Sequence, residues 1–387
     1  MLFTDRRAAL LVAAALLATS GCNGTGAVPA SGGAGASATS FLRAAASPED
    51  TTSILKLLKN NVTIGSTVDP KNRDMGPRAL ATVLNSNGRL KKGDLLVCNF
   101  SNSAGKAGIG TTIEQLAPKA NSSPAQFVQS DKIEGCNGDA VTTLGDQVFA
   151  TGLTSKVMVW FNQAGVLKKT YASPIVDPIG DGDAPPLYIY SPEFVFIGDA
   201  SNGNVDSISL GAYHGNKKLL AVVKGFSVKQ GAGWSGLGPS GFAYNSNSKS
   251  KAWDTLYVAD GACNAVVAIE HASNLLKTGE ITVSNGCKSF KCLYPKTSCA
   301  TLVKDGKPLD TPVAEAILPN GNLIVANGAG GNTLVEMTPT GQVLDTKVVD
   351  TSKTAGIFGL LAVGTNDGNT ALFYTDSNTN TVQELEQ

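Results

Sequence analysis

The stretch that decides the fold is TLYVADGACNAVVAIE, at residues 255–270. It consists of an apolar run ending in Asp260, a short turn containing Gly and Asn, and a second apolar run. Each run is shorter than a helix needs, and the turn between them is typical of a β-hairpin. The same pattern recurs in five other segments: DLLVCNFSNSAGKAGIGTTIEQLAP (94–118), QVFATGLTSKVMVWF (147–161), EFVFIGDASNGNVDSISL (193–210), NLIVANGAGGNTLVEMTP (322–339) and ALFYTDSNTNTVQELE (371–386).

The copies repeat at a nearly regular interval. Each is preceded by a third short segment, as in GPSGFAYNSNS (238–248) and PVAEAILPNGN (312–322), and several are followed by a fourth, as in LLAVVKGFSV (219–228). Four strands per unit in six units predict an all-β fold, a six-bladed β-propeller with four-stranded antiparallel blades. A β-sandwich and a parallel β-helix are the alternatives. Successive copies lie 52, 48, 61, 67 and 49 residues apart when aligned on Asn99, Thr151, Asp199, Asp260, Asn327 and Asp376.

The last unit ends after its third strand, at Gln387. The segment TTSILKLLKNNVTIGSTV (51–68) belongs to no unit and carries enough apolar residues for a buried strand. We therefore expect this N-terminal segment to supply the missing outer strand and close the ring, although ILKLLK also suits a short helix.

The repeats resemble a known family. LYVADGACNAVVAIE and FYTDSNTNTVQELE are similar to NHL-type repeats, whose core is a hydrophobic residue followed by Tyr-Val-Ala-Asp and an Asn-containing turn. The resemblance covers roughly residues 73–387 and implies an NHL-repeat-like six-bladed propeller of a bacterial lipoprotein. Because such propellers include scaffolds, ligand binders and lyases, the resemblance implies a fold and no single activity.

The first 50 residues predict export. Arg6 and Arg7 precede an apolar run of 11 residues, Ala8–Ala18, which is too short for the ~20 residues of a membrane-spanning helix. Residues 1–21 are thus a predicted signal peptide, and Gly21-Cys22 resembles the bacterial lipoprotein box, which implies that Cys22 is lipidated. An ordinary secretory signal is the alternative. Residues 22–50 are a predicted flexible tether to the propeller at 51–387, and the expected location is the bacterial cell envelope, facing the periplasm or the exterior, with membrane contact through the lipid only.

The charge balance disfavours nucleic acid as a partner. The 387 residues hold 31 Lys and Arg against 31 Asp and Glu, so the formal net charge is zero. A protein that binds a polyanion shows a basic excess.

Six cysteines follow Cys22, and an even number in an exported chain predicts disulfides. The first expected pair is Cys98–Cys136, because Cys98 ends the second strand of unit one and Cys136 begins unit two. Three others fall in one insertion, GCKSFKCLYPKTSC, which we expect to be a stapled loop. A zinc site is the alternative, but the insertion contains no His. The six are Cys98, Cys136, Cys263, Cys287, Cys292 and Cys299.

Two features are candidates for ligand binding. The segment DPIGDGDAPP (177–186) carries Asp177, Asp181 and Asp183 in a predicted connection between units, and such carboxylates suit a hard cation such as Ca²⁺. A solvated acidic loop is the alternative. Trp234 is flanked by glycines and is expected either on the rim as a binding platform or over the core.

The recurrent Asp and Asn at the end of each second strand have a structural explanation. Their short side chains accept N–H groups of the following turn. The alternative is that some of these carboxylates line the mouth of the channel and hold a cation. The residues are Asn99, Asp199, Asp260, Asn327 and Asp376.

Two functions from different classes remain. One is a non-catalytic module that binds a protein, a glycan or a small molecule, with no cofactor. The other is a metal-dependent hydrolase or lactonase; the resemblance to gluconolactonase-like propellers implies Glu, Asp and two Asn ligands, but Ser240 stands where one Asn belongs. Streptogramin-lyase-like propellers depend on a His at the mouth, whereas His214 and His271 each follow a third strand. The binding module is therefore favoured, and no residue is predicted to be catalytic.

Overall fold

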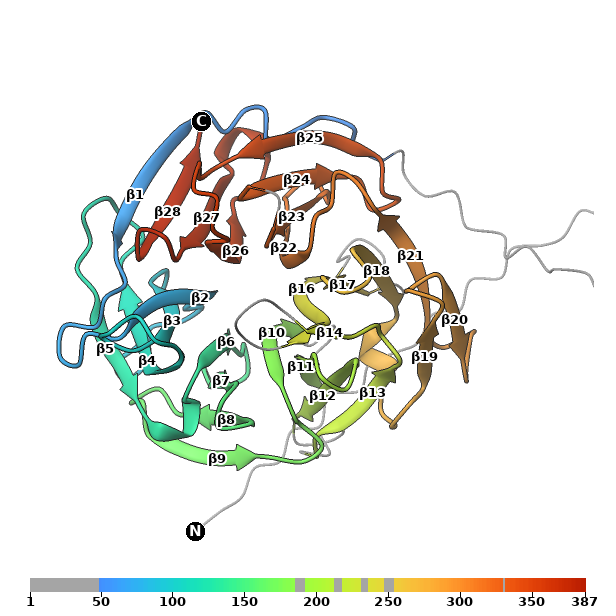
Figure 1. The fold of residues 1–387 in the computed structure, drawn as a ribbon, viewed down its shortest axis with the longest axis horizontal. Helices are drawn as coiled ribbons and strands as arrows, with labels where there is room; N and C mark the ends of the chain where they lie inside the picture. Colours follow the sequence, from blue (N-terminus) through green and yellow to red (C-terminus); the bar gives the residue numbers. More distant parts are fainter. Residues whose placement is uncertain (1–48, 185–191, 212–217, 231–235, 247–253, 330) are drawn as a thin grey trace, which may run out of the picture. The chain divides into compact units, whose positions relative to one another are not determined.

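Short apolar runs between Gly, Asn and Asp turns form the strands of this protein. The computed structural model describes residues 49–184, 192–211, 218–230, 236–246, 254–329 and 331–387. Residues 48–387 form one unit, in which six blades surround a central channel as a β-propeller (Figure 1). Within the described ranges, no helix is long and apolar enough to cross a bilayer. The predicted fold class is confirmed.

Each blade is an antiparallel sheet whose inner strand faces the channel (Figure 1). Blades 1 to 3 consist, from the inner strand outward, of β2 (Met75–Thr82), β3 (Leu95–Ser101), β4 (Ala107–Leu116) and β5 (Ala125–Gln129); β6 (Cys136–Val141), β7 (Val148–Gly152), β8 (Val157–Phe161) and β9 (Leu167–Tyr171); and β10 (Pro178–Ala184), β11 (Glu193–Asp199), β12 (Asn204–Leu210) and β13 (Leu220–Lys224). Blades 4 to 6 consist of β16 (Pro239–Asn245), β17 (Thr255–Asp260), β18 (Ala265–Glu270) and β21 (Cys299–Asp305); β22 (Pro312–Ile317), β23 (Leu323–Asn327), β24 (Thr333–Met337) and β25 (Val343–Val348); and β26 (Ile357–Val363), β27 (Ala371–Asp376), β28 (Thr381–Glu386) and β1 (Asn60–Ser66).

The N-terminal segment closes the ring, as predicted. Strand β1 pairs antiparallel with β28, with Asn60 opposite Glu386. Before it, residues 54–57 form a single turn in which the Leu58 N–H donates to the Ile54 carbonyl at 3.2 Å. This turn buries Ile54, Leu55 and Leu58 in a core shared with blades 5 and 6.

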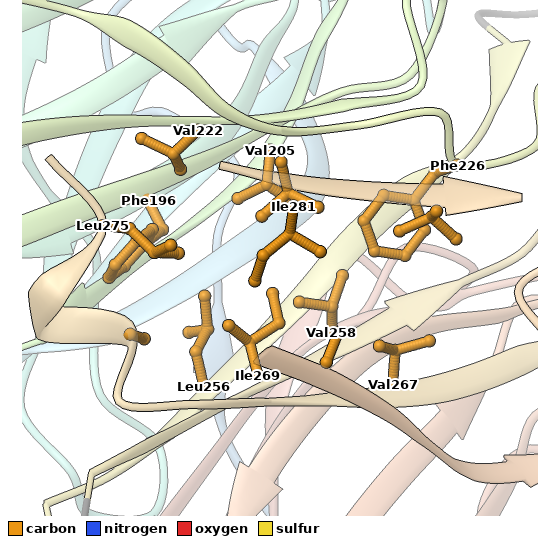
Figure 2. Packing of buried hydrophobic residues seen from close by; sticks show 14 of the residues in the cluster. Phe196, Val205, Val222, Phe226, Leu256, Val258, Val267, Ile269, Leu275 and Ile281 are labelled. Atoms are coloured by element: carbon orange, nitrogen blue, oxygen red, sulfur yellow. The ribbon is translucent and has the colours of Figure 1, made fainter. Parts of the chain in front are cut away.

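A hairpin inserted in blade 4 ties that blade to blade 3. Strand β19 (Ile281–Ser284) pairs parallel with β13 and antiparallel with β20 (Ser289–Cys292). Figure 2 shows Ile281 of the hairpin between Phe196 and Val205 of blade 3 and Leu256 and Ile269 of blade 4. The hairpin therefore covers the apolar space between two blades. A further short pair, β14 (Lys229–Gln230) and β15 (Gly236–Leu237), precedes β16.

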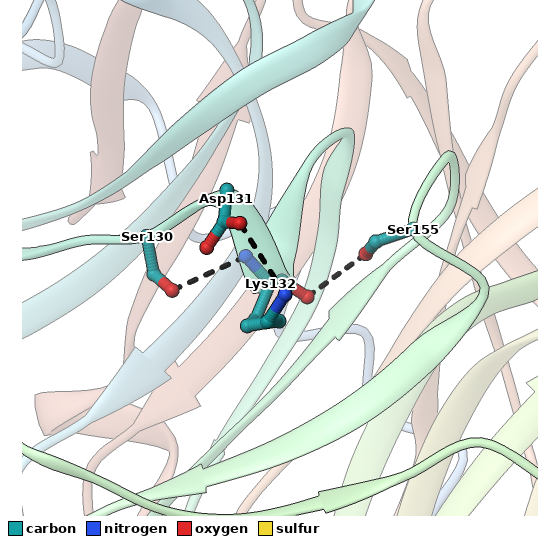
Figure 3. Close-up of polar contacts among 4 residues, drawn as sticks. All are labelled: Ser130, Asp131, Lys132 and Ser155. Carbon is teal, nitrogen blue, oxygen red and sulfur yellow. Dashed lines mark hydrogen bonds and ion pairs between the residues drawn. The ribbon is translucent and has the colours of Figure 1, made fainter.

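The connections between blades share one end of the propeller with the turns after the second strands. Pro239, the first residue of β16, pairs with Asp260, the last residue of β17. We call this end the mouth. At the mouth, η1 (Asp131–Ile133) joins blades 1 and 2: the Lys132 N–H donates to the Ser130 hydroxyl, and the Ser155 hydroxyl donates to the Lys132 carbonyl at 2.8 Å (Figure 3). The Lys132–Asp131 ion pair is exposed and contributes little stability.

All six cysteines beyond Cys22 form disulfides. Cys98–Cys136 joins β3 of blade 1 to β6 of blade 2, which confirms the predicted pair. The Cys292–Cys299 disulfide lies within the insertion. Cys287 of the insertion instead pairs with Cys263, in the turn between β17 and β18. The thiolates that a zinc site would need are therefore not available.

Candidate functional site in the central channel

Six inner strands line the channel, and each packs against the next around the ring. Glycines allow this close approach. A Cβ on Gly241 would lie 2.8 Å from the Ala314 Cα of the neighbouring strand. Gly180 has φ +64°, and a Cβ there would clash with the Ser240 carbonyl. The strands therefore enclose a narrow space.

Every inner strand carries a β-bulge close to the mouth. A bulge bends the strand and changes the direction of a side chain, and bulges are common beside active sites. Without the bulge, successive side chains of each strand would alternate regularly between the two faces of the sheet up to the mouth. The bulged positions include Arg78, Asn137, Gly180, Ser240, Val313 and Phe358.

A cavity of about 70 Å³ lies within this ring, and all six inner strands contribute to its lining. Its side chains follow the two-residue period of a strand and form two tiers. The upper tier, at the bulges, contains Arg78, Asn137, Ser240, Val313 and Phe358. The lower tier, two residues further along each strand, contains Leu80, Asp139, Phe242, Glu315 and Leu360.

Arg78 brings a positive charge into the upper tier. Its guanidinium carbon lies 3.4 Å from the centre of the Phe358 ring and 4.5 Å from that of Phe100. Arg78 is 8% exposed, and burial lowers the pKa of its guanidinium to about 9. The group is thus still mostly protonated at neutral pH, and it makes cation–π contacts with both rings.

Asp139 and Glu315 bring two carboxyl groups into the lower tier. They are 5% and 4% exposed, and none of their four oxygens has a hydrogen-bond partner among the described residues. Burial raises the pKa of each carboxyl well above its usual range. Their strands, β6 and β22, are three positions apart in the ring of six, so the two groups come from opposite sides of the channel (Figure 1). Asn137 adds an unpartnered amide nitrogen in the upper tier.

The structure corrects the expected acidic loop at 177–186. Residues 178–184 form β10, the inner strand of blade 3, so this segment is not a between-blade loop. Asp177 precedes the strand and accepts a hydrogen bond from the Ser201 hydroxyl at 2.6 Å, and its own N–H donates to Asp199. The backbone register places Asp181 opposite Ile197. Pairing with β11 therefore overrides the turn tendency of Gly and Asp.

Two other sequence candidates have different outcomes. Trp234 lies outside the described residues, so its role stays a prediction. Ser240, the residue that the sequence analysis expected at a metal-binding Asn position, is buried and lines the cavity at a bulge.

The Asp and Asn that end the second strands bond either to the following turn or to a connection between blades. Asp260 accepts the N–H groups of Ala262 and Cys263, and Asp376 accepts that of Asn378. Asp199 instead accepts from the connection that leads into β10. The lining of the cavity includes none of the five aligned Asp and Asn residues. The expected bonds from N–H groups of the following turn are therefore found for Asp260 and Asp376. Asn327 instead accepts from the Asp310 N–H before its inner strand, and Asn99 donates to the Thr67 carbonyl.

One group of metal-ligand type occurs in the described part of the chain, and it does not suit a metal. The side chains of Asp260, Cys263 and Cys287 lie within 4.8 Å of one another. The two sulfurs are joined to each other. Burial, although opposed by backbone N–H groups, raises the pKa of Asp260 to about 7.

The sequence analysis missed Asp139 and Glu315 as site residues. Each lies in the short segment that precedes the repeated hairpin and forms the inner strand: CNGDAV for β6 and PVAEAI for β22. A single charge in an otherwise small or apolar inner strand was the available signal. The segments of β16 and β26, PSGFAYN and IFGLLAV, carry no charge at all.

Comparisons with known proteins show likeness in fold. No family model matches the sequence, and no curated protein matches it. A gluconolactonase from Xanthomonas campestris is similar in structure, with a TM-score of 0.51 and 11% identity over 84% of this chain and 88% of that one. A protein assigned as a gluconolactonase gives a TM-score of 0.53 and 12% identity over 86% and 94%. Virginiamycin B lyase from Staphylococcus aureus gives 0.48 and 13% over 85% of each chain. The chain is thus a six-bladed β-propeller with structural neighbours among gluconolactonases.

Proposed function

We propose that this protein is an exported, non-catalytic binding module that holds a small polar ligand in its central channel. The observation that carries the proposal is the cavity lined by all six inner strands, with Arg78, Asp139 and Glu315 buried in it. Buried charged groups are rare unless they are paired, and pockets with a few convergent polar groups are typical ligand sites.

The chemistry of the cavity supports binding more than catalysis. Its lining contains no His and no Cys in the part of the chain that the structure describes. His271 follows β18 at the end of the blade opposite the mouth, since Glu270 pairs with Thr255. Ser240 therefore has no His base beside it for nucleophilic catalysis.

A divalent metal fits the described residues poorly. A metal needs several oxygens that converge on one point. Asp139 and Glu315 come from opposite strands, and neither belongs to a described group of three metal-ligating side chains. A metal-dependent lactonase is therefore the weaker candidate.

Export rests on two lines of support. The three disulfides suit an oxidising compartment outside the cytoplasm. The predicted signal peptide, the lipidated Cys22 and the tether lie in residues 1–50, of which the structure describes only Glu49 and Asp50. Anchoring in the cell envelope through Cys22 and the NHL-type character of the repeats are part of the proposal.

Native mass spectrometry of gently purified protein tests the proposal. We expect a small molecule to be retained by the wild type and lost in Ser240→Phe, which fills the upper tier. Val166→Phe, at an exposed position outside the channel, is the matched control and should retain the molecule. If the wild type and Ser240→Phe carry the same molecules, or none, channel binding is wrong.

A hydrolysis assay tests the alternative. With Ca²⁺, Mn²⁺ or Zn²⁺ added, we expect no turnover of glucono-1,5-lactone above background. Metal-dependent hydrolysis that disappears in Asp139→Asn would establish the lactonase instead.

A further inference from the structure

The two carboxyl groups of the lower tier differ from two other buried glutamates of this protein. Glu336 and Glu193 are fully buried, and backbone N–H groups and hydroxyls donate to both oxygens of each. Asp139 and Glu315 are buried almost as completely without any such donor among the described residues. Glu114 of β4 is also buried without a described hydrogen-bond partner, but it lies outside the cavity. Buried polar groups are nearly always hydrogen-bonded, so an exception inside a cavity points to a ligand.

The remaining charges of the inner strands show what ligand would complement the site. The six inner strands carry Arg78 in β2, Asp139 in β6, Asp181 and Asp183 in β10 and Glu315 in β22. Asp139 and Glu315 each pair with the residue two positions before the end of the second strand, so the backbone places them at one level. Among the described lining residues, the lower tier therefore holds two carboxyls and the upper tier holds the one cation.

Burial alone raises the pKa of Asp139 and of Glu315, without a contribution from Arg78 or from each other. Neither carboxyl has the Arg78 guanidinium as a described hydrogen-bond partner. An organic ammonium carries several N–H donors and can reach acceptors on different strands. A carboxylate on the same ligand would face the guanidinium in the upper tier.

We propose that the channel binds a small zwitterion of the amino-acid class, with its ammonium group donating to Asp139 and Glu315 and its carboxylate directed toward Arg78. This proposal rests on the proposed binding function and names the ligand class for the same site. Ethylamine should bind more weakly than the zwitterion, and acetate more weakly still.

Calorimetric titration at pH 7 tests this with glycine, β-alanine, 4-aminobutyrate, ethylamine, acetate and CaCl₂ as probes. At least one zwitterion should bind tenfold or more tightly than ethylamine and acetate. Because the carboxyls must ionise when the ammonium arrives, binding should release protons, seen as a difference in heat between phosphate and Tris buffers.

Variants separate the roles of the residues. Asp139→Asn and Glu315→Gln should each weaken zwitterion binding at least tenfold and reduce the proton release. Arg78→Met should weaken the zwitterion but leave ethylamine unchanged. Asp206→Asn is the matched control, because Asp206 is also buried without a described hydrogen-bond partner but lies outside the cavity.

Several results would overturn the inference. One is acetate binding as tightly as every zwitterion; another is Ca²⁺ binding that depends on Asp139 and Glu315; a third is no binding by any probe. If native mass spectrometry nevertheless finds a channel ligand without an amine, the proposed binding function stands and only the ligand class is wrong.

Discussion

Glu336 and Glu315 are buried glutamates of the same blade with opposite surroundings. The carboxylate of Glu336 accepts hydrogen bonds from Ser53, Ile54 and Leu55, and so holds the N-terminal segment on blade 5. Glu315 faces the cavity without a described partner. Glu336 therefore stabilises the fold, whereas Glu315 lowers stability unless a ligand donates hydrogen bonds to its carboxyl group.

Asp206 shows what an unpartnered buried carboxyl does to stability outside the cavity. Burial, with the nearby charge of Asp199, raises its pKa to about 7, while Lys224 lowers it. The folded state therefore binds this proton more tightly than the unfolded state, whose pKa is near 3.9. The contribution to stability is complete below about pH 4 and is lost as the pH rises through about 7.

We expect Asp206→Asn to remove this pH dependence. In urea unfolding at a series of pH values, the wild type should lose up to about 4 kcal/mol relative to the variant between pH 4 and pH 7. Asn fits the same space and cannot ionise. Parallel stability curves for the two proteins would show that Asp206 is ionised in the folded state across this range.

At the scale of elements, closure depends on both the turn at 54–57 and strand β1. Strand β1 forms hydrogen bonds with the edge of β28, and the apolar side chains of the turn pack against blades 5 and 6. An uncovered edge and apolar face would otherwise meet solvent. The N-terminal segment is thus a structural part of blade 6.

Two leucines of this turn test the closure. Leu55 is fully buried, so Leu55→Ala should cost about 2–5 kcal/mol in the free energy of unfolding. Leu57, 38% exposed in the same turn, is the control, and Leu57→Ala should change stability by about 0.5 kcal/mol or less. Chemical denaturation measures both, and equal losses would contradict the burial of this segment against the ring.

At the scale of the whole molecule, the propeller follows a predicted signal peptide, lipidated Cys22 and tether. Disulfides connect blade 1 to blade 2 and the inserted hairpin to blade 4. The sequence before residue 49 predicts a lipid anchor followed by a tether rich in Gly, Ala and Ser.

Intact-mass analysis of the protein extracted from bacterial membranes tests the anchor. We expect a mature chain that begins at Cys22 and carries a diacyl- or triacylglyceryl group. A Cys22→Ser variant should be exported without the lipid and be recovered from the aqueous fraction. An unmodified wild-type chain that begins at another residue would leave export in place but remove the anchor.

The blades, their number and their closure could be predicted from the sequence, because strand alternation and Asp or Asn turns are local signals that repeat. The Cys98–Cys136 disulfide could also be predicted, because the repeat places Cys98 at the end of the second strand of one unit and Cys136 at the start of the next. The acidic segment 177–186 was misassigned as a loop, since only pairing with β11 makes Pro178–Ala184 a strand. The channel site depends on the tertiary structure. Asp139 and Glu315 are distant in sequence, and they line one cavity only because the six blades close into a ring. Local sequence patterns specify strands and turns, but the burial of a charge across the axis is a property of the assembled ring.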